Sequence, residues 1–478
     1  MGNPRFPSLF QINTRIWSHV ATLDDIADEE LDRIARRFDW VWLMGVWQTG
    51  EQGRAAALAE PALVDEYRRV LPDFKESDVC GSCFSVAGYT VNGALGGDEA
   101  LARLRERLHE RGLRLMLDFV PNHTGLDHPW VRDHPEFYVQ GAQEDLDLHP
   151  GNYWRSGSAV LAHGRDPYFP GWRDTLQLNY AQPAVQEAMT GEMLRIAGQA
   201  DGIRCDMAML ILPEVFERTW GVRPPPFWPD AIARVREHFP EFVFLAEVYW
   251  DLEWELQQQG FDYTYDKRLY DRLRDGQAGP VRDHFRAGGE FQSKSARFLE
   301  NHDEPRAAAA FPPAMHRAAA VLAFFCPGLR FFHQGQLLGR KVRVPVQLCR
   351  APEEPVDREI REFYERLIEC LRDPILRDGR WELLECLRAW GDNWTNENFL
   401  AFAWTGAGGA RLLVTVNYSA CQSQCYVRPF FPEIGGRRVT FEDRLGQAVY
   451  ERDGGEVLGR GLYLDLGPWG YHVFEVKA

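Results

Sequence analysis

Four short segments of the chain end a run of apolar residues with a carboxylate or a histidine. Each has the pattern of a buried strand whose last residues turn polar. The segments are residues 115–123, 201–206, 242–247 and 297–303. In a barrel of parallel strands, polar side chains at the carboxyl ends of the strands converge on one mouth. The residues expected to share that mouth are Asp118, His123, Arg204, Asp206, Glu247, His302 and Asp303.

Three carboxylates in one cleft suit the cleavage of a glycosidic bond. A retaining reaction needs an ionised carboxylate that attacks the anomeric carbon and a second, protonated carboxyl about 5–5.5 Å away. Asp206 and Glu247 end consecutive predicted strands, which allows that spacing. Arg204 precedes Asp206 by two residues, so it faces the same side of a strand and can keep Asp206 ionised. Glu247 follows five apolar or small residues, so we expect a desolvated carboxyl that keeps its proton, as a general acid requires.

Each of these residues also has an ordinary structural explanation when it is taken alone. An arginine two residues before an aspartate is usually a structural ion pair, and a glutamate at a strand end usually faces solvent. A single histidine or aspartate at such a place is usually hydrogen-bonded and structural. The functional interpretation therefore depends on the conjunction of four segments, in this order and in this strand context.

Strand-like and helix-like stretches alternate about eight times between residues 9 and 336. Buried strands are predicted from continuous apolar runs, and helices from apolar residues at spacings of three and four. The predicted helices are residues 25–38, 98–112, 182–200 and 229–239, and further strands are residues 10–13, 40–45, 260–265 and 328–334, with the seventh strand beginning at Phe298. This alternation is typical of a (β/α)₈ TIM barrel, which places the chain in the α/β class.

Two stretches of the chain do not fit the barrel pattern. About sixty residues separate Asn122 from Pro183, which is too long for a plain loop, so we predict a small inserted subdomain after strand 3. After about residue 378, short β-like runs alternate with Gly and Asp turns, which predicts a C-terminal all-β sandwich. The predicted domains are residues 1–122 and 183–378 for the barrel, 123–182 for the inserted subdomain and 379–478 for the sandwich.

Composition excludes several classes of partner. The chain has 478 residues, with 54 Lys and Arg against 70 Asp and Glu, and a formal net charge of −16. A nucleic acid or an anionic membrane would need a basic face, so we expect neither as a partner. A neutral sugar can bind without a basic face. The sequence does not predict an oligomeric state.

The nine cysteines indicate in which kind of cellular compartment, reducing or oxidising, the protein is expected. Cys80 and Cys83 form a C-x-x-C, but no second pair at zinc-site spacing accompanies them. We interpret all nine cysteines as free thiols in a reducing compartment, with a zinc or redox role for Cys80 and Cys83 as the alternative. The first residues lack the architecture of a signal peptide, and no run of 18 apolar residues occurs. The sequence therefore predicts a cytoplasmic protein.

The four segments resemble the four signature regions of the α-amylase family of glycoside hydrolases (family thirteen). The matching positions are residues 118–123, 202–206, Glu247 and residues 298–303. The layout is also similar, because the family has an inserted domain after the third strand, a Gly-Gln pair after the eighth (here Gly335 and Gln336) and a C-terminal β-domain. The resemblance spans essentially the whole chain.

The resemblance implies a role for each matching residue. Asp206 would be the nucleophile that forms a β-glycosyl-enzyme, and Glu247 the acid and base. Asp303 would hold the 2- and 3-hydroxyls of the sugar and favour a distorted ring. His123 and His302 would hydrogen-bond hydroxyls at the cleavage site. The remaining assignments are that Arg204 would orient Asp206, Asp118 would be more structural than catalytic, and Phe84 would take the place of a tyrosine stacked under the sugar. The alternative interpretation of Phe84 is an ordinary core phenylalanine.

Some positions depart from the family pattern or leave two interpretations. Many members continue after the second region with a lysine and a histidine, whereas this chain has Met209 and Leu210, which argues against an endo-acting starch amylase. Arg306 either helps to close the sugar pocket, as in exo-acting glucosidases and transferases, or pairs with Glu304. Asn122 matches a calcium ligand of many members. Calcium would also need oxygen donors from the inserted domain, where the acidic candidates are Asp145, Asp147, Asp166 and Asp174.

The sequence therefore predicts a retaining α-glycosidase that cleaves α-glucosidic bonds of short oligosaccharides or small glucosides by double displacement. It would need no organic cofactor, and we expect no metal, with calcium at Asn122 as the alternative. A second possibility is a transglycosylase that uses the same intermediate. A third, of another class, is a non-catalytic relative that binds a glycan or a protein, although a pure binder has no need for all three carboxylates.

Overall fold

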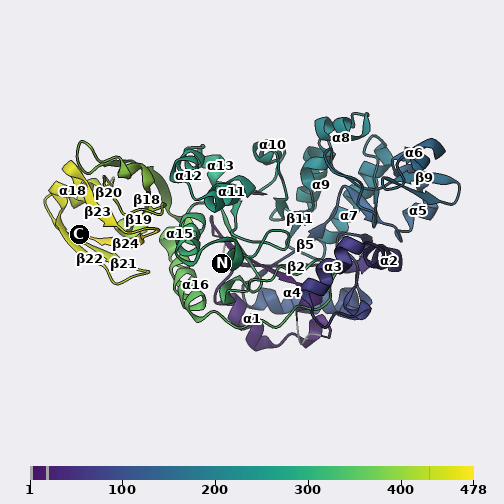
Figure 1. Ribbon diagram of the computed structural model, residues 1–478, viewed down its shortest axis with the longest axis horizontal. Helices are drawn as coiled ribbons and strands as arrows, with labels where there is room; N and C mark the ends of the chain where they lie inside the picture. The colour runs from purple at the N-terminus through teal and green to yellow at the C-terminus, as the bar shows by residue number, and fades with distance from the viewer. Residues whose placement is uncertain (1–3, 18–20, 430) are drawn as a thin grey trace. The chain divides into compact units, whose positions relative to one another are not determined.

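The computed structural model describes residues 4–17, 21–429 and 431–478 (Figure 1). The first three residues, on which part of the prediction for the N-terminus rests, lie outside the described residues. Eight strands form a closed barrel in chain order, which confirms the predicted (β/α)₈ fold. They are β1 (Ser8–Asn13), β2 (Trp40–Met44), β5 (Arg114–Phe119), β11 (Gly202–Cys205), β12 (Val243–Ala246), β13 (Tyr263–Tyr265), β14 (Ser295–Arg297) and β15 (Leu329–His333).

The chain divides into two compact units. Residues 10–265 and 342–353 make up one unit, and residues 1–9, 266–341 and 354–478 make up the other. We call them the N-terminal unit and the C-terminal unit and describe each by itself. The predicted boundaries at residues 123, 183 and 379 stay predictions.

The N-terminal unit carries ten helices among its described residues. Predicted helices at residues 98–112, 182–200 and 229–239 are confirmed as α4, α7 and α9, and the stretch predicted as residues 25–38 forms the shorter α1. Leu101, Leu104 and Leu108 of α4 are buried, as their spacing predicts. The helices are α1 (Asp28–Ala35), α2 (Glu51–Ala59), α3 (Pro61–Val70), α4 (Gly97–Glu110), α5 (Trp130–Asp133), α6 (Gln143–Leu148), α7 (Pro183–Ala197), α8 (Pro213–Trp220), α9 (Trp228–His238) and α10 (Glu253–Gln258).

The long connection after β5 contains small sheets of its own. Strand β6 (His123–Gly125) pairs antiparallel with β10 (Thr175–Gln177). Between them, β7 (Gln140–Gly141), β9 (Ala159–Ala162) and β8 (Tyr153–Ser156) form a three-stranded sheet. Elsewhere in this unit, β3 (Trp47–Thr49) pairs with β4 (Val86–Val91). The first and last residues of the connection are therefore held next to one another by the β6–β10 pair.

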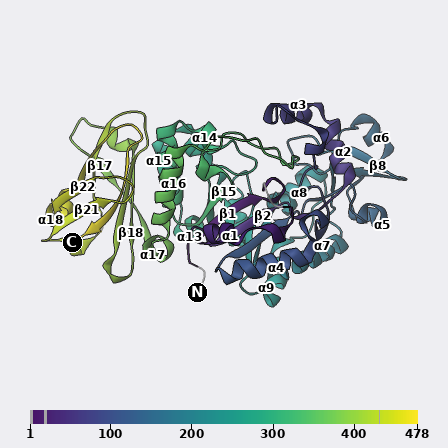
Figure 2. The same ribbon diagram turned by 90° about the horizontal axis from the view of Figure 1, so that it is seen from below.

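The C-terminal unit ends in two antiparallel sheets that share one hydrophobic core. The larger sheet has the order β16 (Arg380–Leu384), β18 (Phe399–Thr405), β19 (Arg411–Asn417), β24 (Tyr471–Lys477), β21 (Arg438–Asp443) and β22 (Val449–Asp453). The smaller one has the order β17 (Cys386–Arg388), β20 (Ser423–Val427) and β23 (Leu462–Leu466). Figures 1 and 2 both show these strands, in green and yellow, next to helix α15 (Pro313–Phe324). The other helices of this unit are α11 (Lys267–Asp275), α12 (Ala278–Phe285), α13 (Gly289–Ser293), α14 (Ala307–Ala310), α16 (Arg358–Leu371), α17 (Pro374–Asp378) and α18 (Gly454–Arg460).

The prediction that the seventh strand begins at Phe298 is wrong. The strand is Ser295–Arg297, and Phe298 lies just past its end. Arg297 is fully buried there because Asp266 forms an ion pair with it and Gln292 accepts a hydrogen bond from it. A buried charge of this kind interrupts the apolar run from which a buried strand is predicted.

The described residues contain no helix that is both long and apolar enough to cross a membrane.

Candidate active site

Three neighbouring strands of the N-terminal unit position the predicted residues at two levels. Arg204 of β11 lies opposite Asp118 of β5 on one side and Leu245 of β12 on the other. Because side chains on a strand alternate between faces, Asp206 and Glu247, two residues further on, lie one level up on the same face. Arg204, Asp206 and Glu247 are all buried. The strand pattern therefore brings one arginine and two carboxyl groups together.

The guanidinium of Arg204 binds both carboxyl groups. Its Nη1 donates to Oδ1 of Asp206 at 2.5 Å, and its Nη2 lies 2.7 Å from Oε2 of Glu247. The Arg204 side chain is 0% exposed, so these contacts form away from bulk water, where charge-assisted hydrogen bonds are strongest. The two carboxyl groups therefore lie side by side across a single planar cation, which suits the short separation of a retaining pair.

Two further donors fix Glu247. The N–H of Met207 donates to Oε2 at 2.7 Å, and the hydroxyl of Tyr249 donates to Oε1 at 2.8 Å. Met207 has a φ of 42°, in the left-handed region that side chains other than glycine rarely adopt. Such local strain is concentrated at functional sites, where the surrounding structure imposes it. Here the unusual conformation directs a backbone donor of the residue after Asp206 toward the neighbouring carboxyl group.

Aromatic rings enclose the same guanidinium. The Cζ atom of Arg204 lies 5.3 Å from the ring centroid of Trp42, 5.2 Å from that of Phe84 and 5.5 Å from that of Tyr265. The Tyr265 hydroxyl also accepts a hydrogen bond from Nε of Arg204 at 3.2 Å. A desolvated guanidinium is stabilised by such ring faces. Phe84, which was predicted at the site, therefore contacts its central cation and stays half-buried.

Asp118 has a structural environment. Its Oδ1 accepts a hydrogen bond from Nε1 of Trp42 at 2.8 Å, and its Oδ2 accepts one from the N–H of Gly45 at 2.6 Å. The side chain is fully buried, and its backbone oxygen accepts a bond from Nε1 of Trp47. Both carboxylate oxygens thus bind β2 and the turn after it, which agrees with the structural role that the resemblance implies.

His123 combines burial with an open hydrogen-bonding position. Burial lowers the pKa of its imidazole to about 4, so the ring is neutral at physiological pH. Its Nδ1 lies 3.3 Å from Nδ2 of Asn122, and its ring packs on Trp172. Its Nε2 has no hydrogen-bond partner among the described residues. A buried ring nitrogen left in this state can be satisfied by a ligand hydroxyl.

The C-terminal unit holds the remaining predicted residues, in the loop after β14. Nε2 of His302 lies 3.0 Å from Oδ2 of Asp303, whose side chain is 45% exposed. Oδ1 of Asn301 accepts the backbone N–H groups of Asp303 and Glu304, both at 2.9 Å, and so shapes the turn that presents them. That His302, Asp303 and Arg306 act together with Asp206 and Glu247 stays a prediction.

Arg306 does not pair with Glu304. It is buried, and its Nη1 lies 3.1 Å from Oε1 of Glu300, while its Nη2 donates to the carbonyl oxygen of Gln334 at 2.8 Å. Glu304 instead lies 3.2 Å from Nζ of Lys267. The reason is that Glu300 is fully buried and needs a cation, whereas Glu304 can reach the lysine at the start of α11. Burial raises the pKa of Glu300 to about 7.

The environment of Asn122 does not fit a calcium ion. The amide nitrogen of Gln177 donates to Oδ1 of Asn122 at 3.0 Å, to the Asn122 carbonyl oxygen at 2.9 Å and to the Leu178 carbonyl oxygen at 3.1 Å. The three oxygens that a calcium ion would need as ligands are therefore already hydrogen-bonded to one amide nitrogen.

The acidic candidates of the inserted segment do not supply ligands either. Asp145, Asp147 and Asp166 accept hydrogen bonds from groups within their own turns or helix. Burial raises the pKa of Asp174 to about 6. Within the described ranges, no three His, Cys, Asp or Glu side chains are grouped as metal ligands would be.

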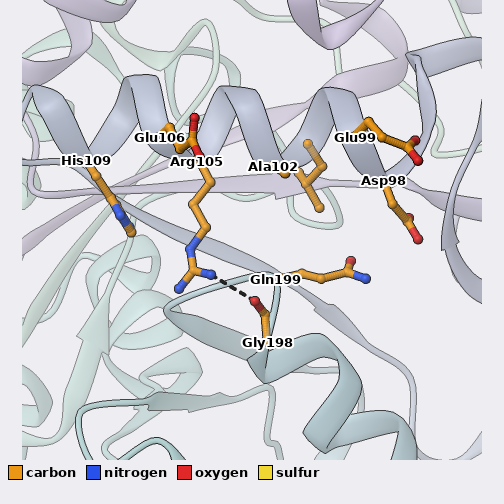
Figure 3. Close-up of a pocket in the computed structure, with 9 residues that line it drawn as sticks. Asp98, Glu99, Ala102, Arg105, Glu106, His109, Gly198 and Gln199 are labelled. Atoms are coloured by element: carbon orange, nitrogen blue, oxygen red, sulfur yellow. Dashed lines mark hydrogen bonds between the residues drawn. The ribbon is translucent and has the colours of Figure 1, made fainter.

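A separate hollow lies between helix α4 and the segment that follows α7 (Figure 3). It has a volume of about 580 Å³ and lies beside Gly198 and Gln199, which follow α7. Arg105 reaches from the helix to the carbonyl oxygen of Gly198, and both Arg105 and His109 bind the carboxylate of Asp201. Its basic groups are thus engaged in holding α4 to the start of β11, and we assign no function to it.

The comparisons with known proteins agree with this geometry. Residues 84–266 match the sequence model of the α-amylase catalytic domain. This match confirms the resemblance to the α-amylase family. The matched region contains Arg204, Asp206 and Glu247.

Two α-amylase-family relatives and one solved structure illustrate the similarity. Alpha-amylase MalA of Haloarcula japonica is 27% identical over 263 residues, which are 53% of this chain and 36% of that protein. Trehalose synthase of Pimelobacter is 29% identical over 204 residues, which are 37% of this chain and 34% of that protein. The aligned regions thus span about a third of each relative. The noncanonic maltogenic alpha-amylase AmyB from Thermotoga neapolitana superposes with a TM-score of 0.72 over 99% of both chains at 18% identity, which shows the fold.

Sequence reasoning missed several residues of the α-amylase-like site. Tyr249 carries a detectable signal, because it stands two residues after Glu247 and so shares its face. Tyr265 ends the predicted sixth strand and could have been found in the same way. The backbone donor at Met207 has no signal in the sequence, because it depends on a left-handed conformation of a methionine. Met209 and Leu210 are buried, so the apolar residues at these positions belong to the core.

Proposed function

We propose that the protein is a retaining α-glycosidase that acts on α-glucosidic bonds of short oligosaccharides or small glucosides. The observation that carries the proposal is the buried guanidinium of Arg204, which binds Asp206 and Glu247 at once. A structural ion pair needs one carboxylate for one arginine, whereas double displacement needs two neighbouring carboxyl groups of different roles. The names of the relatives, an α-amylase and a trehalose synthase, support the same substrate class.

In the first step, a carboxylate oxygen of Asp206 attacks the anomeric carbon while Glu247 gives its proton to the departing glycosidic oxygen. The bond from the anomeric carbon to that oxygen breaks, and a β-linked glycosyl-enzyme forms. In the second step, Glu247 takes a proton from water, whose oxygen displaces Asp206 and restores the α configuration. Arg204 keeps Asp206 ionised as the attacking group.

Neighbouring residues would bind and shape the sugar. We assign to Nε2 of His123 a hydrogen bond with a sugar hydroxyl, because that buried atom has no partner among the described residues. Phe84 would provide an apolar face next to the reaction centre. His302 and Asp303 would hold further hydroxyls, as the family resemblance implies, and Arg306 would support their loop through its pair with Glu300.

The test of this proposal is the Glu247→Gln variant with two substrates. We expect hydrolysis of maltose, whose leaving group needs a proton, to fall by about 10²–10⁴-fold, which is the usual contribution of a general acid. With an α-glucosyl fluoride, whose leaving group needs no proton, the first step should survive and a covalent adduct on Asp206 should accumulate, detectable by intact-protein mass spectrometry. Glu241→Gln, an exposed position in the turn just before the same strand, is the matched control. Equal rates for wild type and Glu247→Gln on both substrates would refute the proposal.

Transglycosylation is the second candidate, favoured by the similarity to a trehalose synthase. It differs only in the acceptor, because a sugar hydroxyl replaces water in the second step. Incubation with maltotriose distinguishes the two. Products longer than the substrate would assign a transferase, and glucose with maltose as the sole products would assign a hydrolase.

For the setting of this activity, we propose the reducing cytoplasm, because all nine cysteines are free thiols. A small carbohydrate would be the only partner that the reaction requires, and it would proceed without an organic cofactor or a metal.

A further inference from the structure

One segment of the N-terminal unit comes from far along the chain. Residues 342–353, which we call the strap, lie against the loop of residues 75–82. Val79 and Leu348 form an antiparallel β-bridge, and Leu348 is fully buried in a hydrophobic cluster with Tyr67 and Leu71. Arg350 binds the carboxylate of Asp78 through two nitrogens, at 3.1 and 2.8 Å. Arg350 also pairs with Asp73, and Arg343 pairs with Glu66. The strap is therefore held by one short bridge, one hydrophobic cluster and the ion pairs of its two arginines.

Two cysteines flank this bridge on the same face. The N–H of Cys80 donates to the carbonyl oxygen of Gln347 at 2.8 Å, and the N–H of Cys349 donates to that of Asp78 at 2.9 Å. These are the positions next to Val79 and Leu348, so both side chains lie opposite to those of the bridged pair. Each thiol is among the groups that shift the pKa of the other, that of Cys80 downward and that of Cys349 upward. Each sulfur also lies 3.3 Å from a backbone carbonyl oxygen of the opposite segment.

The surroundings favour a thiolate at Cys80. Nη1 of Arg15 lies 3.3 Å from its sulfur. The Cys349 thiol, together with this cation, lowers the pKa of Cys80 to about 7 although burial opposes the shift. Cys349 is exposed, so small reagents can reach the pair. A partly accessible thiolate beside a cation, with a second thiol in contact, is the arrangement of a reactive pair with its own resolving cysteine.

We propose that Cys80 and Cys349 are a redox-active dithiol, the site of reversible disulfide formation between the strap and the loop of residues 75–82. The oxidant is a low-molecular-weight disulfide such as oxidised glutathione. The Cys80 thiolate attacks one sulfur of that disulfide and releases one thiol. The Cys349 sulfur, after losing its proton to solvent, attacks the Cys80 sulfur of the mixed disulfide and releases the second thiol. Two protein thiols and one small disulfide thus become one protein disulfide and two small thiols.

A second pair of cysteines, in the C-terminal unit, lacks the features that favour a thiolate at Cys80. Cys386 and Cys425 lie on the paired antiparallel strands β17 and β20, and Cys386 is among the groups that raise the pKa of Cys425. Cys425, however, is fully buried in the core that the two C-terminal sheets share, and no cation lies among the groups that act on it. Burial raises its pKa far above the usual range, so it stays a thiol. We therefore expect Cys386 and Cys425 not to form a disulfide, because Cys425 is buried and no cation among the described residues acts on it.

Disulfide formation would replace weak contacts of the strap by a covalent link. The loop that carries Cys80 continues to Phe84, whose ring contacts Arg204. Oxidation therefore joins the strap to the segment that carries an aromatic residue of the candidate site. The proposal does not depend on the glycosidase assignment, because a disulfide can be detected without measuring activity.

The experiment exposes the full-length protein to oxidised glutathione, blocks remaining thiols with N-ethylmaleimide and maps disulfides by mass spectrometry. We expect a peptide pair linked through Cys80 and Cys349, its disappearance after dithiothreitol, and a melting temperature higher in the oxidised than in the reduced protein. Cys349→Ser should leave a glutathione adduct on Cys80, because the resolving thiol is gone. Cys386→Ser is the matched control and should form the same linked pair as wild type.

The contrary results are equally specific. Recovery of Cys80 and Cys349 as separately blocked thiols after oxidation would overturn the proposal, and so would a link between Cys80 and Cys83 in its place. Linkage of Cys386 to Cys425 at the same rate would show that contact between thiols alone suffices, and that the environment of Cys80 has no special role.

Discussion

Arg204 is the residue on which the arrangement of the candidate site depends. Its guanidinium has no exposed surface and binds two carboxyl groups, one phenolic hydroxyl and the faces of three rings. Only a planar cation with several fixed donors can satisfy all of these at once. Removing it would leave two buried carboxyl groups without their cation, and a single broken buried pair costs about 3–5 kcal/mol.

We therefore predict that Arg204→Lys is not a conservative change. A lysine can reach one carboxylate with a single ammonium group, but it cannot bridge two, so Asp206 and Glu247 should lose their common orientation. The expected result is a fall in kcat of at least about 10²-fold together with a lower melting temperature. Calorimetry and initial rates on an aryl α-glucoside provide the measurements.

The control for this prediction is Arg195→Lys on helix α7, where the guanidinium is 44% exposed and pairs with Glu192. Exposed pairs contribute little to stability, so this variant should resemble wild type in both measurements. Unchanged kcat in Arg204→Lys would mean that the bridge between the two carboxyl groups is dispensable.

For single residues, the sequence predicts which residues belong to the candidate site better than it predicts which residues contact one another. Asp206, Glu247 and Arg204 could be found because each stands at or next to a strand end and the alternation of side chains puts them on one face. The partner of Arg306 could not, because Glu304 is only two residues away in sequence whereas the actual partner, Glu300, is six residues away and is distinguished by its burial. The left-handed φ of Met207 is set by the turn between β11 and its successor, and methionine gives no sign of it.

Among the elements, the β6–β10 pair is stabilised by a side-chain amide that binds several backbone and side-chain oxygens. Gln177 stands opposite His123 in that pair, and its amide nitrogen faces three oxygens that belong to Asn122 and Leu178. An amide donor binds these oxygens through hydrogen bonds, which join the start and the end of the inserted segment.

From this we predict that the protein does not depend on calcium for stability. Treatment with EDTA should leave the melting temperature unchanged, whereas Gln177→Ala should lower it, because Oδ1 of Asn122 and the Leu178 carbonyl oxygen lose the Gln177 donor at a cost of about 1–3 kcal/mol for each group left unsatisfied. The Asn122 carbonyl oxygen keeps the N–H of Leu178 as a donor. Differential scanning calorimetry with and without EDTA measures both. Gln182→Ala, just before helix α7 and outside this cluster, serves as the control. A drop in the melting temperature of wild type in EDTA would contradict the prediction.

The elements themselves were largely predictable, because the barrel strands are apolar runs and the helices have regular apolar spacing. The seventh strand is the exception. Its residues Ser295, Ala296 and Arg297 lack an apolar run, and its arginine is tolerated only because Asp266 and Gln292 meet it inside the fold. Sequence patterns register hydrophobicity, and they cannot anticipate an ion pair between residues that the fold brings together.

For the whole molecule, stability should depend on pH through buried groups of opposite kinds. Burial lowers the pKa of His316 from 6.5 to about 4, and it raises the pKa of Glu300 from 4.5 to about 7. Below pH 6.5 the unfolded chain binds a proton at His316 that the folded protein does not bind. The contribution of His316 is therefore fully present above pH 6.5 and is lost as the pH falls to about 4. For Glu300 the contribution is present below pH 4.5 and is lost as the pH rises to about 7.

The prediction is that two variants show opposite trends when each is compared with wild type. The stability advantage of wild type over His316→Gln should shrink by roughly 3 kcal/mol as the pH falls from 6.5 to 4, since a shift of one pKa unit corresponds to about 1.4 kcal/mol. Glutamine keeps a hydrogen-bonding partner for Tyr364, which lies 2.9 Å from Nε2 of the histidine. The advantage over Glu300→Gln should instead shrink as the pH rises from 4.5 to 7. Urea unfolding at a series of pH values gives both differences, and parallel curves for wild type and either variant would show that the group titrates alike in the folded and the unfolded chain.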